Sequence, residues 1–287
     1  MEQTEMKNES GFDREAWKEQ KQADRKEAFD LIDVTADSMC RDAGLFQSCL
    51  DVMARFDRYS VGNVLLVASQ NPNATRLADF ATWKKEDVSI KKGEKSMLLL
   101  EPGKEYTKSD GTTGVNYNTK RVFDISQTDA EPVPQEKQYE IRQLVKALFH
   151  TGACQAEIRD DLPGDKLAVY DSQRKRILLR RGTPGDENLF RAYSCEMTMA
   201  YLDTAGNALR KDSAFTAMCS SYVVCRRFGL DTSSFNFRFI PDQCGDMDAK
   251  EMRSKLKEIR ECAVRICGDM TQYLEKAQKQ PKSTEVR

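Results

Sequence analysis

A continuous apolar stripe near the end of the sequence constrains the fold more than any other feature. Between residues 252 and 273, apolar side chains recur at alternating intervals of four and three residues, which is the period of an α-helix. The stripe comprises Met252, Leu256, Ile259, Ala263, Ile266, Met270 and Tyr273. A helix of this length must bury its apolar face against other elements, so we predict a packing face here and not a ligand site.

Other patterns predict an α/β fold of the α+β type, in which small sheets accompany the helices. We expect helices over residues 12–39, 45–56, 61–69, 79–85, 135–149, 186–203 and 214–228. We expect strands over residues 97–100 and 115–125, paired as a hairpin, and over residues 156–158, 167–170 and 176–179. The sequence DAEPVP at 129–134 breaks regular structure and predicts two domains, at residues 12–130 and 135–276, the second mostly helical.

The charge balance is close to neutral, with 45 Lys and Arg residues against 46 Asp and Glu residues, so any basic surface must be local. No run reaches the roughly 18 apolar residues that a membrane helix needs. The first residues lack the apolar segment of a secretion signal. We therefore expect a cytoplasmic protein that does not bind a membrane.

Nine cysteines are scattered along the 287 residues without a CxxC pair, and the sequence contains a single histidine, His150. Without a secretion signal, reduced thiols are expected in place of a disulfide scaffold. One histidine excludes every site that needs two imidazoles, including the HExxH metallopeptidases. We expect no structural zinc site and no other cofactor.

Five lysines crowd into twelve residues directly after Trp83, at positions 84, 85, 91, 92 and 95. The predicted hairpin carries Tyr106, Tyr117, Lys120 and Arg121. Lysines bind phosphates by charge while aromatic rings stack on unpaired bases, a combination typical of proteins that bind single strands. In this interpretation Trp83 faces the DNA, and Phe80 and Val88 supply the core contacts. A solvated lysine loop with Trp83 in the core is the alternative, and both stay open.

Four blocks of this region carry a resemblance to a known family. They are YSVGNVLLVASQNP at 59–72, WKK at 83–85, KKGEK at 91–95 and VFDISQT at 122–128. In order and spacing they resemble the N-terminal domain of the ArdC-type antirestriction proteins of plasmids and conjugative elements. The resemblance implies a domain that binds single-stranded DNA, and it carries that role to Tyr59, Ser60, Asn63, Trp83, Lys84, Lys85, Lys91, Lys92 and Lys95. Gly62 departs from a position that the family commonly fills with a basic residue, which would weaken one phosphate contact.

The second half is similar to the zincin-like metallopeptidase domain of the same family, but without its catalytic groups. Cys195 and Met199 stand at the two histidine positions of HExxH, Glu196 is retained, and Met218 aligns with the third ligand, a glutamate. A thioether is a poor zinc ligand, and a glutamate without a metal-bound water has no zincin mechanism. The resemblance therefore implies a catalytically inactive pseudo-metallopeptidase that holds no metal.

Two further interpretations of the second half, each of which assigns a chemical role to Cys195, stay open beside this one. Cys195, Cys219 and Cys225 would form a thiolate metal site if the fold brought them together. Cys195 would act as a protease nucleophile if His150 served as its base. Scattered cysteines are more often buried as small apolar residues.

Taken with the resemblance, the sequence predicts sequence-independent binding of single-stranded DNA by a protein of a mobile genetic element, with protection of incoming DNA from restriction. The alternative function is protein interaction, in which the peptidase-like domain binds a host or element-encoded protein. An enzyme whose metal is held by thiolates and Glu196 is the third possibility.

Overall fold

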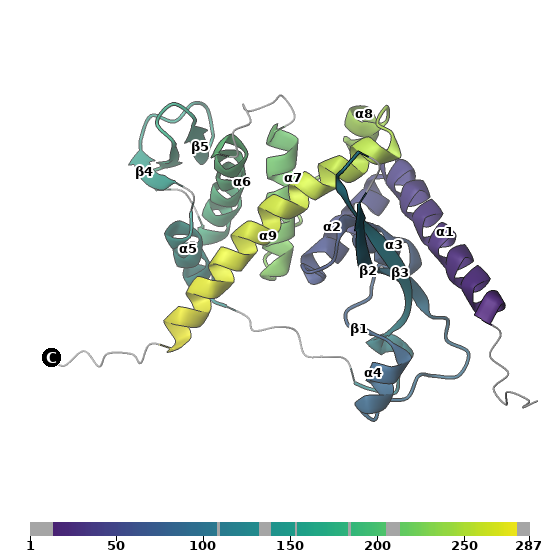
Figure 1. Cartoon of the computed structure of the whole chain (residues 1–287). Coiled ribbons are helices and arrows are strands. Elements are labelled where there is room, and N and C mark those ends of the chain that lie inside the picture. The colour runs from purple at the N-terminus through teal and green to yellow at the C-terminus, as the bar shows by residue number, and fades with distance from the viewer. Residues whose placement is uncertain are drawn as a thin grey trace, which may run out of the picture.

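Long helices carry most of the fold, and two small sheets accompany them, as the sequence predicts (Figure 1). The computed structural model describes residues 14–107, 110–131, 139–152, 154–182, 185–204 and 213–279. The helices are α1 (Arg14–Met39), α2 (Ala43–Arg55), α3 (Val61–Gln70), α4 (Phe80–Lys85), α5 (Ile141–His150), α6 (Asp186–Thr204), α7 (Ser213–Arg227), α8 (Ile240–Cys244) and α9 (Ala249–Lys279). The strands are β1 (Leu77–Ala78), β2 (Met97–Thr107), β3 (Thr113–Asp124), β4 (Gln155–Arg159), β5 (Ala168–Asp171) and β6 (Arg176–Arg180).

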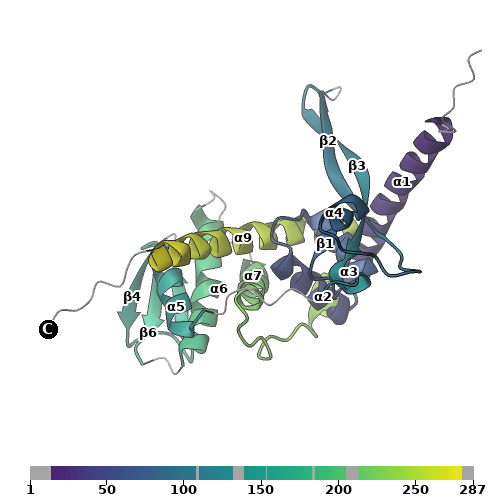
Figure 2. The same cartoon turned by 90° about the horizontal axis from the view of Figure 1, so that it is seen from below.

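Helix α9 confirms the predicted packing stripe. Six of its seven members are buried, and at the C-terminal end Leu274 is buried while Tyr273 is only half-buried. The helix runs diagonally across the molecule and packs on α1 and α3 at one end and on α5, α6 and α7 along the rest of its length (Figures 1 and 2). Side chains from both halves of the sequence therefore meet in one continuous apolar core.

Local capping explains where the N-terminal helices begin. The carboxylate of Asp42 accepts hydrogen bonds from the backbone of Gly44 and Leu45 at the start of α2, and Asp79 does the same for Thr82 in α4. The hydroxyl of Ser60 accepts from the backbone of Asn63 at 3.3 Å at the start of α3. Each cap satisfies donors that the first helical turn leaves free, so the boundaries agree with the sequence.

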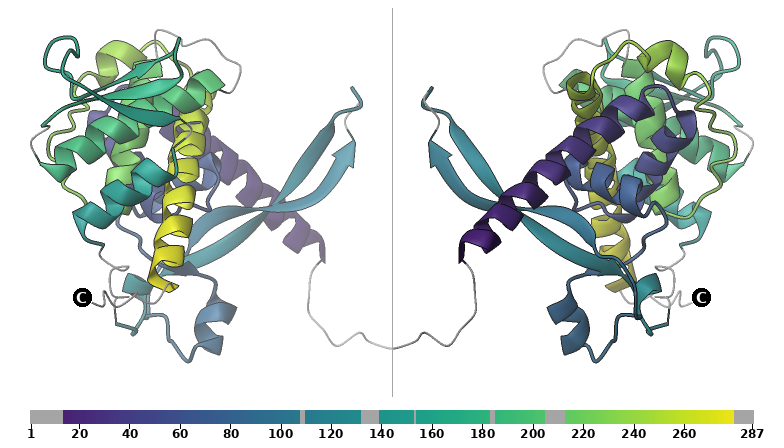
Figure 3. Two further views of the ribbon diagram at one scale, coloured as in Figure 1. Left: turned by 90° about the vertical axis from the view of Figure 1, so that its left-hand side faces the viewer. Right: turned by 90° about the vertical axis from the view of Figure 1, so that its right-hand side faces the viewer.

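Strands β2 and β3 form a long antiparallel hairpin, with Leu99 paired to Lys120 and Met97 to Val122. The short strand β1 pairs with the other edge of β3, so the strand order is β1-β3-β2. Beyond its first residues the hairpin leaves the core, and it projects to the same side as the N-terminal part of α1 (Figure 3).

A second small sheet has the order β4-β6-β5, with β4 parallel and β5 antiparallel to β6. It packs on α6. Its three strands confirm those predicted at 156–158, 167–170 and 176–179. The sequence analysis missed the short helix α8, which has a proline at its start and follows a segment with Phe235, Phe237 and Phe239.

Residues 132–138, with most of the predicted domain boundary, lie outside the described residues. On either side of them the halves are in close contact. Phe46 of α2 packs against Phe215 and Phe237 with ring centres 5.8 and 5.6 Å apart, and Arg226 pairs with Asp51 at 2.8 Å. The division into 12–130 and 135–276 stays a prediction. In the part of the chain that the structure describes, no helix has the length and apolar character to cross a membrane.

Candidate nucleic-acid interface

The five clustered lysines lie on the surface around α4 and the turn that leads to β2. Lys84 and Lys85 occupy the last turn of α4, and the other three, at 91, 92 and 95, surround Gly93. Gly93 has a φ of +92°, which a residue with a side chain rarely adopts, so the turn depends on glycine. All five side chains are exposed, and none forms an ion pair with an acid among the described residues. Lys91 donates to the carbonyl of Ser126 at 2.9 Å. We name these five residues the lysine platform.

Trp83 does not face this platform, and the prediction that it stacks on bases is wrong. Its side chain is fully buried, and its indole Nε1 donates to the carbonyl of Phe123 at 3.1 Å. The guanidinium of Arg76 lies 4.8 Å from the ring centre. Phe80, expected in the core, is instead 61% exposed. The alternative interpretation of Trp83 as a core residue is therefore confirmed.

The side-chain amide of Asn63 bonds to the backbone of β2. Its amide oxygen accepts from the backbone nitrogen of Leu100 at 2.9 Å, and its amide nitrogen donates to the Leu100 carbonyl at 2.8 Å. Gln70, seven residues along α3, makes the same pair of bonds to Leu98, at 2.7 and 3.0 Å. The two amides thus satisfy the backbone of β2 at its free edge. Asn63 and the helix cap Ser60 thus have structural roles, and their contact with DNA stays a prediction.

Lys120 and Arg121 differ from the platform because each has acidic partners. Lys120 Nζ lies 2.9 Å from carboxylate oxygens of both Asp79 and Glu101, and these bonds raise its pKa. Hydrogen bonds from Thr82 and Lys120 lower the pKa of Asp79 to about 2. Arg121 pairs with Asp24 of α1 at 2.8 Å. Their charges are compensated within the fold, so they are weaker candidates for phosphate contact than the platform.

Tyr59 is half-buried and stacks on Phe56, with ring centres 5.0 Å apart and planes 11° from parallel. Burial raises the pKa of its hydroxyl. With Lys120 it borders a hollow of about 220 Å³ at the base of the hairpin. The ring of Tyr59 thus packs against Phe56 and also lines the hollow.

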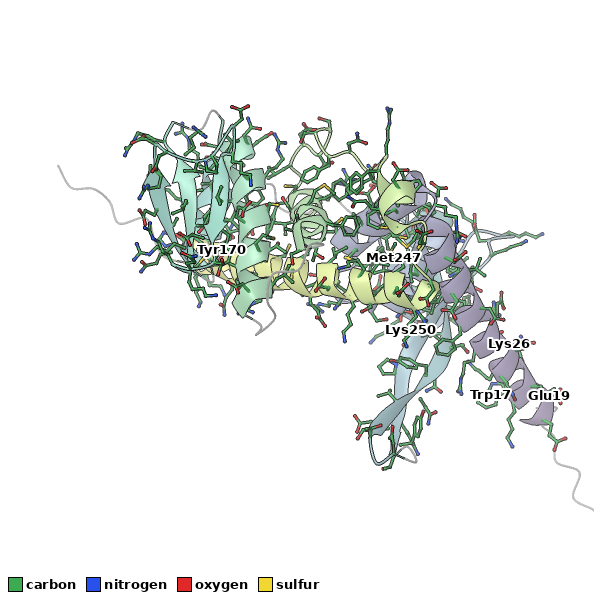
Figure 4. All side chains as sticks on the ribbon, turned by 90° about the horizontal axis from the view of Figure 1, so that it is seen from above. Trp17, Glu19, Lys26, Tyr170, Met247 and Lys250 are labelled. Carbon is green, nitrogen blue, oxygen red and sulfur yellow. The ribbon has the colours of Figure 1, made fainter. Side chains whose placement is uncertain are left out.

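Among the described residues, four exposed aromatic rings lie on the hairpin or on α1. The sequence analysis named two of them, both on the hairpin, as candidates for base stacking. Tyr106 and Tyr117 are 46% and 37% exposed. Trp17 and Phe29 of α1 are 50% and 37% exposed, and Phe29 meets Tyr117 edge to face at 6.2 Å. Figure 4 places Trp17 on the projecting part of α1, on the hairpin side of the molecule. The sequence signal for Trp17 was an aromatic residue in an otherwise polar helix.

The predicted peptidase residues lie on α6 and α7. Cys195 and Met199 are one helical turn apart on α6, Glu196 lies between them, and Met218 is on α7. Burial raises the pKa of Cys195 to about 12, so the thiol stays protonated. Glu196 accepts a hydrogen bond from the backbone nitrogen of Tyr170 at 2.7 Å and so ties β5 to α6. Two thioethers, which are poor zinc ligands, and a carboxylate already bonded to Tyr170 do not suit a zinc ion.

The other interpretations of the second half find no support in the arrangement of these residues. Cys219 and Cys225 are both buried on α7, and burial raises the pKa of each thiol. The described residues contain no group of three or more His, Cys, Asp and Glu side chains that could hold a metal ion. His150 stacks on Tyr273 of α9, with ring centres 5.0 Å apart.

The stability of this part of the fold should depend on pH through the carboxyl group of Glu196. Burial raises its pKa above the ordinary 4.5, so the folded protein binds its proton more tightly than the unfolded chain does. Its contribution to stability is therefore fully present below about pH 4.5 and is lost as the pH rises through the raised value.

The variant Glu196→Gln keeps an oxygen for the Tyr170 nitrogen but cannot ionise, so it should flatten this part of the stability profile. Denaturant unfolding from roughly pH 4 to pH 7 measures the effect. Glu187→Gln, at an exposed position on the same helix, should leave the profile unchanged. Equal profiles for the wild type and Glu196→Gln would contradict the expectation.

Comparisons with known proteins agree with this picture of the N-terminal region. Residues 41–146 match the model of a family described as the N-terminal domain of anti-restriction factor ArdC. The uncharacterized protein pXO2-81 of Bacillus anthracis is 24% identical over an alignment that covers 79% of this chain and 48% of that protein. The chain thus spans about half the length of this curated relative.

Two solved structures are similar in fold. The Mn(II)-bound crystal structure of the antirestriction ArdC protein from the R388 plasmid aligns with a TM-score of 0.50 at 15% identity, over 75% of this chain and 90% of that one. The metal-free structure of the same protein gives 0.49 at 15% identity, over 75% and 86%. The fold of this chain is therefore similar to that of the ArdC protein. Within the chain, residues 41–146 match the N-terminal domain of anti-restriction factor ArdC.

Proposed function

We propose that this protein binds single-stranded DNA without sequence preference, in the cytoplasm of a cell that carries a mobile genetic element, and that it protects such DNA from restriction. The lysine platform is the observation that carries the proposal. Five exposed lysines without acidic partners among the described residues form a local positive surface on a chain whose formal net charge is −1. The match of residues 41–146 to the N-terminal domain of anti-restriction factor ArdC supports the antirestriction role.

Phosphate binding by such a surface is electrostatic and independent of sequence, because each lysine that contacts a phosphate releases a condensed counterion. Base stacking supplies the remaining affinity in single-strand-binding proteins. Since Trp83 is buried, we assign this part to the exposed rings of Tyr106 and Tyr117 on the hairpin. The platform at the base and the tyrosines farther out would follow one strand along the hairpin.

The lysine platform is tested by the salt dependence of DNA binding. The variants Lys84→Gln with Lys85→Gln, and Lys92→Gln with Lys95→Gln, should each reduce the slope of log K against log[salt] by up to about 0.7 per lost contact. Fluorescence anisotropy with a labelled oligomer of mixed sequence measures the slope.

The matched control is Lys250→Gln with Lys276→Gln, which removes two exposed lysines of α9. This control should bind like the wild type. Unchanged affinity and slope in both platform variants would mean that these lysines are merely solvated, and the proposal would fail.

For the second half of the chain we propose an inactive, peptidase-like scaffold. The chemistry of Cys195, Glu196, Met199 and Met218 supports this, because the donors do not suit zinc. The variant Cys195→His with Met199→His should not hydrolyse casein, since Met218 still leaves the third ligand position without a donor oxygen.

Metal analysis of the purified wild-type protein tests the same proposal without relying on activity. We expect well under one zinc ion per chain. One tightly bound zinc ion per chain that disappears in Cys195→Ala would overturn the inactive assignment and favour an enzyme with a thiolate-held metal.

A further inference from the structure

The hollow of about 220 Å³ at the base of the hairpin is formed by the sheet, α3 and α4. Leu99 and Lys120 are cross-strand partners, and Val122 is two residues along β3, so these three side chains share one side of the hairpin. Thr119 and Arg121 alternate with them on the other side, where α1 covers the sheet. The hollow is therefore a consequence of strand alternation and of the side on which α1 packs.

The lining combines an apolar floor with a polar rim. Leu77, Leu99 and Val122 supply the apolar surface, and the half-buried Tyr59 forms a wall. The hydroxyl of Tyr59 has no hydrogen-bond partner among the described residues. Lys120, with its two carboxylate partners Asp79 and Glu101, lies at the same hollow and offers a donor beside acceptors.

The size of the hollow restricts its occupant. Clefts that enclose drug-sized molecules have volumes of roughly 300–1,000 Å³, so a hollow of about 220 Å³ suits one smaller group. The edge of a nucleobase carries both donors and acceptors, and its faces are apolar. A single unpaired base thus matches the apolar residues, the aromatic ring of Tyr59 and the polar groups that line the hollow.

The position of α4 connects the hollow to the lysine platform. Thr82 lines the hollow, and Lys84 and Lys85 follow it by two and three residues on the same short helix. The cap by Asp79 holds the start of this helix, and burial of Trp83 holds its middle against β3. Thr82 and Lys85 are three residues apart and so are neighbours on the helix surface, which places the platform next to the hollow.

We propose that this hollow receives one unstacked base of the bound strand while the neighbouring phosphates lie on Lys84 and Lys85. The proposal rests on the proposed function and adds a base subsite to it. Because the rim offers donors and acceptors together, the subsite takes a base as a class and does not require one sequence.

The test fills the hollow and compares two probes. The first probe is a mixed-sequence DNA oligomer, and the second is an abasic oligomer of equal length that keeps the sugars and phosphates. Thr82→Phe places a ring in the hollow and should weaken binding of the first probe about five- to tenfold. It should leave binding of the abasic probe unchanged, since the lysines remain.

Ala81→Phe is the matched control, because it adds the same ring to α4 at an exposed residue that does not line the hollow. It should bind both probes like the wild type. Ala78→Leu narrows the hollow from β1 and should reproduce the effect of Thr82→Phe, and thermal melts identify the variants that are folded. If Thr82→Phe does not fold, Ala78→Leu decides the question.

Two results would overturn the subsite, and they differ from failure of the proposed function. In one, a folded Thr82→Phe or Ala78→Leu protein binds the mixed-sequence oligomer as tightly as the wild type. In the other, it loses affinity for both probes equally. If the wild type binds neither probe, the proposed function fails and the subsite fails with it.

Discussion

Replacing Trp83 with alanine should lower the free energy of unfolding by about 3–5 kcal/mol, because it empties a fully buried site. The change also removes the indole donor of the Phe123 carbonyl and the ring beneath the Arg76 guanidinium. Denaturant unfolding of the two proteins measures the difference. Any loss of DNA binding should follow the fraction of unfolded protein.

Two variants separate the parts of this effect. Trp83→Phe keeps most of the buried ring but leaves the Phe123 carbonyl without the indole nitrogen, so it should be less destabilising than the alanine variant. Lys85→Ala, two residues along α4 and exposed, should change stability by less than about 0.5 kcal/mol. A folded Trp83→Ala protein with wild-type stability and weakened DNA binding would restore the stacking interpretation.

The second large effect is expected at the free edge of β2. Asn63→Ala and Gln70→Ala each remove a side-chain amide that serves both the donor and the acceptor of one leucine backbone unit. Leaving such groups without partners costs about 1–3 kcal/mol for each buried group. We expect each variant to lose stability in this range, and the double variant to lose more than either alone.

Thermal unfolding checks this expectation against Asn116→Ala, which removes an exposed amide from the hairpin itself. That control should be close to neutral, since its side chain makes no hydrogen bond with the described residues. If Asn63→Ala kept wild-type stability but weakened binding of single-stranded DNA, Asn63 would contact the ligand after all.

The two predictions include Trp83 and Asn63, which the resemblance assigns to DNA and which make bonds within the fold in this structure. In one sequence a motif marks positions that matter, but it does not separate a ligand contact from a structural bond. Asn63 and Leu100 are 37 positions apart, and Trp83 and Phe123 are 40 apart. Their contacts depend on how the hairpin returns to α3 and α4, which no local pattern contains.

Features that depend on neighbouring residues were determined by the sequence itself. Apolar periodicity predicted α9, and the helices expected over residues 61–69 and 79–85 agree with α3 and α4, each of which begins after a capping side chain. That neither residue 195 nor residue 199 is a histidine was also visible without a structure, because residue identity alone decides which ligands exist.

Only the tertiary structure decided which charged and aromatic side chains are exposed and unpaired, and so able to contact a ligand. Lys120 and Lys92 look alike in the sequence, yet Lys120 meets Asp79 and Glu101 while Lys92 has no acidic partner among the described residues. Glu196 is predicted from the resemblance to be a retained catalytic residue, whereas in the fold its carboxylate accepts a hydrogen bond from Tyr170, 26 residues away. The physical reason is the same in each case: helix periods and caps are set within a few residues, whereas burial and pairing depend on segments that meet only after the chain has folded.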